Sequence, residues 1–223
     1  MSDRLSPFSE ELITGLEAWP RSSEHRFVFP WPVPGNPAEF QKFENFEQWR
    51  ARVEELDLAE GIPLIVSAKY ARAQRLMLLA WVNGDVAKAA ELVALTALEL
   101  ALTNAYGREA LPWAIAKGMA RNRKKPRVIG DTKVDKAPFA ALLKYMVEED
   151  GLNDDKVAMN RRCGGGTVIG FLTGDTKPSL ADIRNAAAHG DPFDGWPRSG
   201  LVELCRDLIE YAHRDLIAAP RRA

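Results

Sequence analysis

An arginine and a histidine near the C-terminus could together carry out acid–base chemistry on a phosphate group. Arg184 and His189 lie in one short polar segment, residues 182–190, which holds one of the chain's three histidines. An imidazole titrates near neutral pH and can act as a general base or acid. A guanidinium is a permanently charged fork that suits phosphate oxygens. The pair could therefore help a ribose 2′-hydroxyl attack the adjacent phosphorus, with the arginine stabilising the charge on the phosphoryl oxygens.

The same segment has the signals of a short helix. Ser179 and Asp182 resemble a capping box in which Asp replaces the usual Glu or Gln, and Gly190 provides the stop. Between the arginine and the histidine, three alanines (186–188) leave a small surface that another surface could approach closely. We therefore expect one capped helix that carries both functional side chains.

The helical geometry separates the two candidates. Arg184 and His189 are five residues apart, which places them about 140° apart around an ideal helix. Asp182, Asn185 and His189, at i, i+3 and i+7, do share a face. Asn185 and Asp182 are thus candidates to support the histidine, and Arg184 needs a second surface to complete a site with it.

The rest of the chain is predicted to be a helical scaffold for this segment. Apolar periodicity predicts about seven or eight helices and no strand. Two long helices, over residues 64–82 and 85–106, are joined by the tight turn Asn83-Gly84-Asp85 and should be antiparallel. The second is apolar almost all round, which is typical of the buried centre of a bundle, and we expect it to end at Gly107.

Glu99 interrupts the apolar surface of that second helix. With Thr96 and Thr103 it forms a narrow polar line, and a carboxylate among leucines needs a partner. One interpretation is that the line faces water or a neighbouring salt bridge. The other is that Glu99 orients Arg184.

Residues 1–60 are predicted to form an extension, followed by a helical bundle over residues 61–218. Phe27, Phe29 and Trp31 alternate with prolines, which indicates an extended arm that packs on the body or a ligand for a proline-reading domain. Asn36 and Pro37 then predict the start of an amphipathic helix reaching residue 56.

Charge is distributed unevenly along the chain. The 223 residues have a net charge of −1, but residues 1–60 carry 12 acidic and 6 basic residues, whereas residues 117–136 carry 2 and 8. The basic run is either a solvated loop or a patch for the RNA backbone; its cations are Arg121, Arg123, Lys124, Lys125 and Arg127.

Several classes of protein are disfavoured by composition. No stretch is apolar enough to span a bilayer, and the first twenty residues lack the features of a signal peptide. The two cysteines, Cys163 and Cys205, do not have metal-ligand spacing. We expect a cytoplasmic protein that needs no metal and no other cofactor.

The string from Arg184 to His189, with Asn185 directly after the arginine, resembles the Arg-x(4–6)-His signature of the HEPN superfamily. This resemblance implies an all-α helical bundle, a homodimer, and a cleft that the motif helices of two protomers form together. It further implies metal-independent cleavage of RNA in toxin–antitoxin or defence systems, with Arg184 and His189 catalytic, and a possible antitoxin or nucleotidyltransferase partner. Residues 1–60 lie outside the resemblance.

The bare spacing is not specific, because it occurs again from Arg206 to His213. There an Arg206–Glu210 pair at i, i+4 is typical of a solvated helix face. Two alternatives to the ribonuclease remain open: a non-catalytic HEPN-like module that binds nucleotide, RNA or a protein, and a structural helical protein in which His189 only ends a helix.

Overall fold

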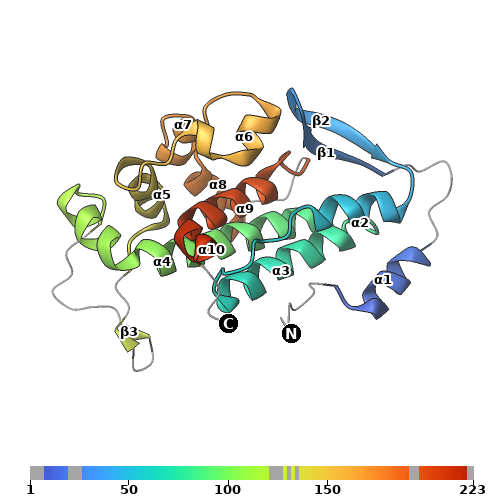
Figure 1. The fold of residues 1–223 in the computed structure, drawn as a ribbon, viewed down its shortest axis with the longest axis horizontal. Helices are drawn as coiled ribbons and strands as arrows, with labels where there is room; N and C mark the ends of the chain where they lie inside the picture. Colours follow the sequence, from blue (N-terminus) through green and yellow to red (C-terminus); the bar gives the residue numbers. More distant parts are fainter. Residues whose placement is uncertain are drawn as a thin grey trace.

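One long helix, α4 (Val86–Ala116), runs through the molecule and organises the other elements around it. The structure is a computed structural model that describes residues 8–19, 27–120, 128–129, 132–133, 136–190 and 196–219. In Figure 1 a β-hairpin lies toward one end of α4 and helix α5 lies beside the other end. The described chain is mostly helical, as predicted, but it contains strands that were not predicted.

Helices α3 (Leu64–Leu79) and α9 (Leu201–Ala212) pack along α4 and form the main core with it. The predicted turn between α3 and α4 is confirmed, because Asn83 Oδ1 accepts the backbone N–H of Asp85 at 3.1 Å. Leucines and alanines of α4, among them Leu95 and Leu98, are completely buried. Burial on several sides explains why α4 is apolar almost all round.

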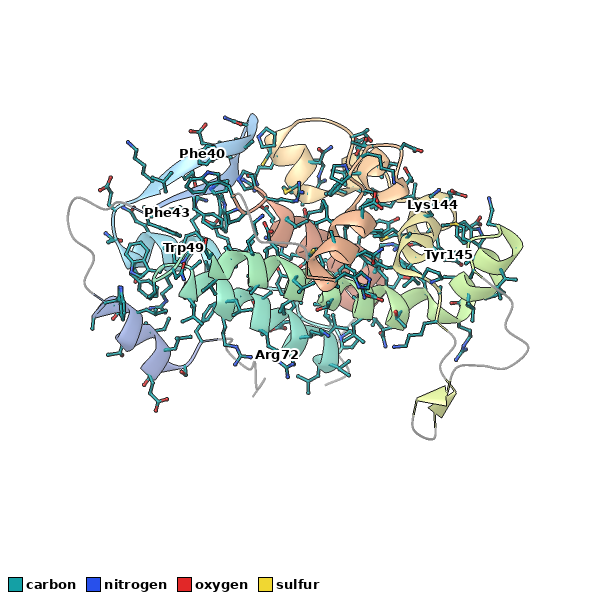
Figure 2. The ribbon with its side chains drawn as sticks, turned by 180° about the vertical axis from the view of Figure 1, so that it is seen from behind. Phe40, Phe43, Trp49, Arg72, Lys144 and Tyr145 are labelled. Carbon is teal, nitrogen blue, oxygen red and sulfur yellow. The ribbon has the colours of Figure 1, made fainter. Side chains whose placement is uncertain are left out.

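The prediction that α4 ends at Gly107 is wrong. The helix continues for nine more residues, past Pro112, because its second half packs against α5 (Phe139–Glu148). The Trp113 ring lies edge-on to Tyr145, with ring centroids 5.6 Å apart, and its indole N–H donates to Glu149 at 2.8 Å. Figure 2 shows Tyr145 at this end of the molecule. Tertiary packing thus outweighs the cost of about 1 kcal/mol for a glycine inside a helix.

The predicted helix from Pro37 onward is also wrong in its first part. Residues Phe27–Val33 form β1 and Asn36–Phe43 form β2, an antiparallel hairpin. The helix α2 (Phe46–Glu54) begins only after Asn45, whose side chain accepts the backbone N–H of Gln48. Phe40 and Phe43 of β2 are three residues apart, a spacing that fits one face of a helix but lies on opposite faces of a strand, so the apolar pattern favoured a helix over this short stretch.

The hairpin packs its aromatic side chains into the same core as the helices. Trp49 of α2 is fully buried among Phe27, Phe29, Trp31 and Phe43, with ring centroids 4.8–5.7 Å away. Its indole N–H donates to the carbonyl of Met77 on α3 at 3.0 Å. Figure 2 shows Phe43 and Trp49 toward the helices and Phe40 farther out on the hairpin. The packing arm predicted from the sequence is therefore one strand of this hairpin.

The remaining elements are short. They are α1 (Glu10–Glu17), β3 (Val128–Ile129), β4 (Thr132–Lys133), the 3-10 helix η1 (Asp154–Lys156), α6 (Ala158–Cys163), α7 (Val168–Thr173), α8 (Leu180–Ala188) and α10 (Arg214–Ala218). The glycine run 164–166 lies in the connection between α6 and α7. The Asp154 carboxylate accepts the N–H groups of Val168 and Ile169 at the start of α7. Within the described ranges, no helix has both the length and the apolar character needed to cross a membrane.

Candidate functional site

Helix α8 carries the predicted site, and its start is fixed by the predicted capping box. The Ser179 hydroxyl oxygen accepts the N–H of Asp182 at 3.1 Å, and the Asp182 carboxylate accepts the N–H and O–H of Ser179 at 3.0 and 2.7 Å. Lys177 donates to the same carboxylate at 2.8 Å. These donors, Lys177 first, hold the pKa of Asp182 well below its usual range. Asp182 therefore holds the start of α8 in place, a turn away from Asn185 and two from His189.

Arg184 is held against the central helix. Its Nη2 donates to the carboxylate of Glu99 on α4. The side chains of Arg184 and Glu99 are 25% and 31% exposed, so this ion pair is partly shielded from solvent. The structure thus brings together the two residues that the sequence interpretation linked, and it gives the carboxylate in the apolar helix its partner.

The remaining contacts of Arg184 restrict its orientation further. Its Nη1 donates to Asn185 Oδ1 at 3.2 Å, and its Nε is buried without a hydrogen-bond partner among the described residues. Thr96 and Thr103 donate to backbone carbonyls of α4, at 2.9 and 2.7 Å, so their hydroxyls are engaged within the helix itself. Of the polar line on α4, Glu99 alone reaches the motif arginine through its side chain.

His189 lies on the open side of α8. It is the C-cap residue, and Gly190 follows it with a left-handed φ of 83° that ends the helix. Asp182, Asn185 and His189 are all exposed, as their shared face predicted. No described residue hydrogen-bonds to the His189 ring, which leaves both ring nitrogens accessible to a ligand or to another surface.

A single protomer therefore presents its two candidate groups in different settings. The arginine is fixed beside α4, and the imidazole projects from the end of the same helix into solvent. The predicted RNA-contacting residues Arg121, Arg123, Lys124, Lys125 and Arg127 lie outside the described residues. Within the described ranges, no group of three or more His, Cys, Asp and Glu side chains is arranged to hold a metal ion.

The second Arg–His spacing belongs to the core, and the prediction of a solvated face there is wrong. His213 is 3% exposed; its Nδ1 lies 3.0 Å from the Ile209 carbonyl and its Nε2 3.3 Å from Asn104 Oδ1. Glu210 does not pair with Arg206; its carboxylate accepts the N–H of Ala59 at 2.7 Å. The sequence pattern was misleading because polar side chains that are hydrogen-bonded within a core have the same spacing in the sequence as those on a solvent-exposed helix face.

Arg206 belongs to a buried charge cluster that the sequence interpretation missed. It donates to Asp207 at 2.7 Å and to Glu203 at 3.2 Å, and Arg162 of α6 donates to both oxygens of Glu203 at 2.7 Å. The two arginines also bind carbonyls of the N-terminal part: Arg162 that of Pro32 and Arg206 that of Glu55. The contacts of Arg206 with Glu203 and Asp207 are local, but the contacts that bury the cluster, from Arg162 and to the carbonyls of Pro32 and Glu55, are long-range and leave no pattern in local spacing.

Comparison of the chain with protein-family models, with curated proteins and with solved structures found no match.

Proposed function

We propose that this protein is a metal-independent endoribonuclease of the HEPN type that acts as a homodimer. The observation that carries the proposal is the fixed position of Arg184: Glu99 holds it on α4, while the same short helix presents an accessible His189. Arginine and histidine are the groups that cleavage at a ribose 2′-hydroxyl needs, as a charge stabiliser and a proton acceptor.

In the proposed reaction His189 accepts the proton of a ribose 2′-hydroxyl. The 2′-oxygen forms a bond to the adjacent phosphorus, and the bond from phosphorus to the 5′-oxygen of the next nucleotide breaks. The guanidinium of Arg184 stabilises the extra negative charge on the phosphoryl oxygens. A water molecule donates a proton to the leaving 5′-oxygen and receives one from the His189 imidazolium, so the imidazole becomes neutral again. The products are a 2′,3′-cyclic phosphate and a 5′-hydroxyl.

Two features of α8 favour a site shared between two copies. Arg184 and His189 point in directions about 140° apart, so one helix cannot place both groups around one phosphate. The exposed side of α8 between them carries alanines, with Ala186 and Ala188 exposed, so that a second helix can approach closely. A two-fold arrangement of α8 helices would give each phosphate an arginine and a histidine.

The test is cleavage of single-stranded RNA by the purified protein in excess EDTA. We expect fragments that end in 2′,3′-cyclic phosphate, and we expect their formation to fall by about 10³-fold or more in His189→Ala and Arg184→Ala. Arg161→Ala is the matched control, because Arg161 is an exposed arginine on α6, outside the α8 site.

Mixing the two variants tests the composite site. If each site takes its arginine from one copy and its histidine from the other, heterodimers of Arg184→Ala with His189→Ala regain part of the activity, because one of their two sites is intact. Absence of any cleavage by the unaltered protein across RNA substrates, or cleavage that survives in both variants, would overturn the proposal. Binding of RNA without cleavage would instead favour the non-catalytic module.

A further inference from the structure

An open groove lies between the hairpin and the start of α4. It has a volume of about 330 Å³, at the lower end of the range for small-molecule sites. Its lining comes from β1, from the first turn of α4 and from the segment before α9: Phe27, Val28, Phe29, Gly84, Asp85, Lys88, Trp196 and Pro197. The groove is thus mainly aromatic and apolar, with one cation and one carboxylate.

Two exposed aromatic rings stand together at this groove. Trp196 is 64% exposed and Phe40 of β2 is 52% exposed, and their rings meet edge to face with centroids 5.6 Å apart. Single exposed aromatics are common on protein surfaces, but two that support each other beside a cavity form a stacking platform. An exposed indole face is the surface on which a flat heterocycle stacks.

The backbone of β1 adds a hydrogen-bonding edge to the groove. A proline cannot donate a backbone hydrogen bond, so within a strand its N–H position faces away from the partner strand. The N–H position of Pro30 therefore lies on the outer edge of β1, the edge that is not paired with β2. Farther along β1, where the register shifts between Trp31 and Val33, Arg162 donates from outside the hairpin to the carbonyl of Pro32 at 3.1 Å. The register puts Val28 and Pro30 at equivalent positions, so the N–H and C=O of Val28 also point outward. No described residue outside the hairpin bonds to these two groups.

The outer edge of β1 does not suit pairing with an additional β-strand, but it suits contact with the edge of a flat heterocyclic ring. Pro30 removes the next outward donor, and the register shifts beyond Trp31, so a peptide strand could form its ladder with Val28 alone. One adjacent donor and acceptor, in contrast, match the donor and acceptor neighbours on the edge of a nucleobase. A cavity of 330 Å³ is also too small for a helix of 10–12 Å diameter to enter.

The groove and the α8 site lie along one line of the central helix. Lys88, at the groove, and Glu99, which holds Arg184, are eleven residues apart on α4, which is three turns plus about 20°. The two points are therefore on the same side of α4 and about 17 Å apart along its axis. A single strand of a few nucleotides could cover that distance.

We propose that this groove is a nucleobase subsite for single-stranded RNA, with Trp196 stacking on the base, Phe40 supporting the Trp196 ring edge to face, and the Val28 backbone contacting the edge of the base. The assignment of RNA as the ligand rests on the proposed function. Lys88 lies 3.7 Å from Glu91, so its ammonium charge is partly balanced, and stacking and edge contacts provide most of the affinity. The base held here would position the strand that passes on to Arg184.

The test measures binding of a short, fluorescein-labelled single-stranded RNA of mixed sequence to full-length protein carrying His189→Ala, so that cleavage does not interfere. Trp196→Ala should weaken binding about 10- to 100-fold, and Phe40→Ala less. Trp19→Ala is the matched control, because Trp19 is a tryptophan of similar exposure, 50%, outside the groove, and this variant should bind as the parent does.

A second variant tests the strand edge separately. Val28→Pro removes only the outward N–H, at a position equivalent to Pro30, so the hairpin should remain folded by circular dichroism. We expect binding to weaken by about 5- to 10-fold, since one hydrogen bond is lost. Binding of AMP to the same protein tests whether the groove takes a free nucleotide or a base within an RNA strand. If AMP binds as tightly as the RNA does, the RNA subsite is overturned.

The proposal of a nucleobase subsite in the groove and the proposal of a ribonuclease can be contradicted independently of each other. RNA binding that is unchanged in both Trp196→Ala and Val28→Pro overturns the groove, whether or not the protein carrying His189 cleaves RNA. Loss of binding in Trp196→Ala, with no cleavage by the unaltered protein, supports the groove and contradicts the proposed reaction.

Discussion

The guanidinium of Arg184 donates to the carboxylate of Glu99, so the short helix α8 and the central helix α4 are joined by an ion pair at the candidate site. The side chain of Arg184 is three-quarters buried there, and its Nη1 continues to Asn185. An arginine that is held in this way keeps one orientation and loses less freedom when it meets a phosphate.

Removing the carboxylate of Glu99 should therefore impair RNA cleavage without abolishing it. We expect Glu99→Ala to lower the cleavage rate by about 100-fold, because the arginine is misplaced, and Glu99→Gln, which keeps one acceptor oxygen, to lower it less. The rates are measured at saturating RNA. Thr103→Val is the control, since its hydroxyl bonds only to the backbone carbonyl of Glu99. Equal rates for Glu99→Ala and the parent would show that the ion pair has no positioning role.

The second Arg–His pair should affect stability and leave cleavage unchanged. His213→Ala removes a buried ring with contacts to Ile209 and Asn104, and we expect a loss of about 2 kcal/mol in the free energy of unfolding. For a chain of this size that corresponds to a fall of about 4–8 °C in Tm. Thermal unfolding followed by circular dichroism gives the value. A variant that keeps its Tm but loses cleavage would place His213 in the reaction.

The charge cluster around Glu203 should contribute strongly to stability. Glu203 is 5% exposed and faces Arg162 and Arg206, so Glu203→Gln leaves two partly buried cations short of a counter-charge. We expect the free energy of unfolding, measured by urea denaturation, to fall by about 3 kcal/mol. The control variant is Arg52→Ala, which breaks an exposed ion pair with Glu55. It should change the free energy of unfolding by about 0.5 kcal/mol or less.

Glu91 should make stability depend on pH in the opposite way to an ordinary paired carboxylate. Burial raises its pKa from 4.5 to about 7, although Lys88 and the N–H of Arg198 act to lower it. The folded state therefore binds more protons than the unfolded state between these two values, and stability falls as the pH rises from 4.5 through 7. The full effect is about 3 kcal/mol.

Glu91→Gln tests this dependence, because glutamine can still accept the Arg198 N–H but cannot ionise. The free energy of unfolding of the variant should vary less between pH 5 and pH 8 than that of the parent (a range chosen to bracket the shifted pKa). At pH 8 the variant should be the more stable of the two. Parallel curves for the two proteins would contradict the raised pKa.

The sequence predicted the elements whose signals are local. The cap at Ser179, the turn at Asn83 and the buried character of α4 are all found, because each depends on neighbouring residues or on long apolar periodicity. The hairpin was missed because Phe40 and Phe43, three residues apart, fit the period of a helix better than that of a strand. The end of α4 was misplaced because packing of Trp113 on α5 outweighs a glycine.

The candidate site was predictable to a similar extent. Glu99 was suspected because a carboxylate among leucines needs a counter-charge, and its contact with Arg184 is found. The pair of Phe40 and Trp196 could not be predicted, since its members come from segments that are far apart in the sequence. Contacts that only the tertiary fold creates leave no signature in local spacing.

The links from Arg162 to Pro32 and from Arg206 to Glu55 have a consequence for the order of events during synthesis. Both carbonyls belong to the N-terminal quarter of the chain, whereas their donors, and the Glu203 that orients them, emerge much later from the ribosome. The hairpin must wait for α6, and the end of α2 for α9, before these carbonyls have their hydrogen-bond donors. Until then the nascent chain exposes an aromatic surface, so its yield in cells should depend on chaperones more than its final stability suggests.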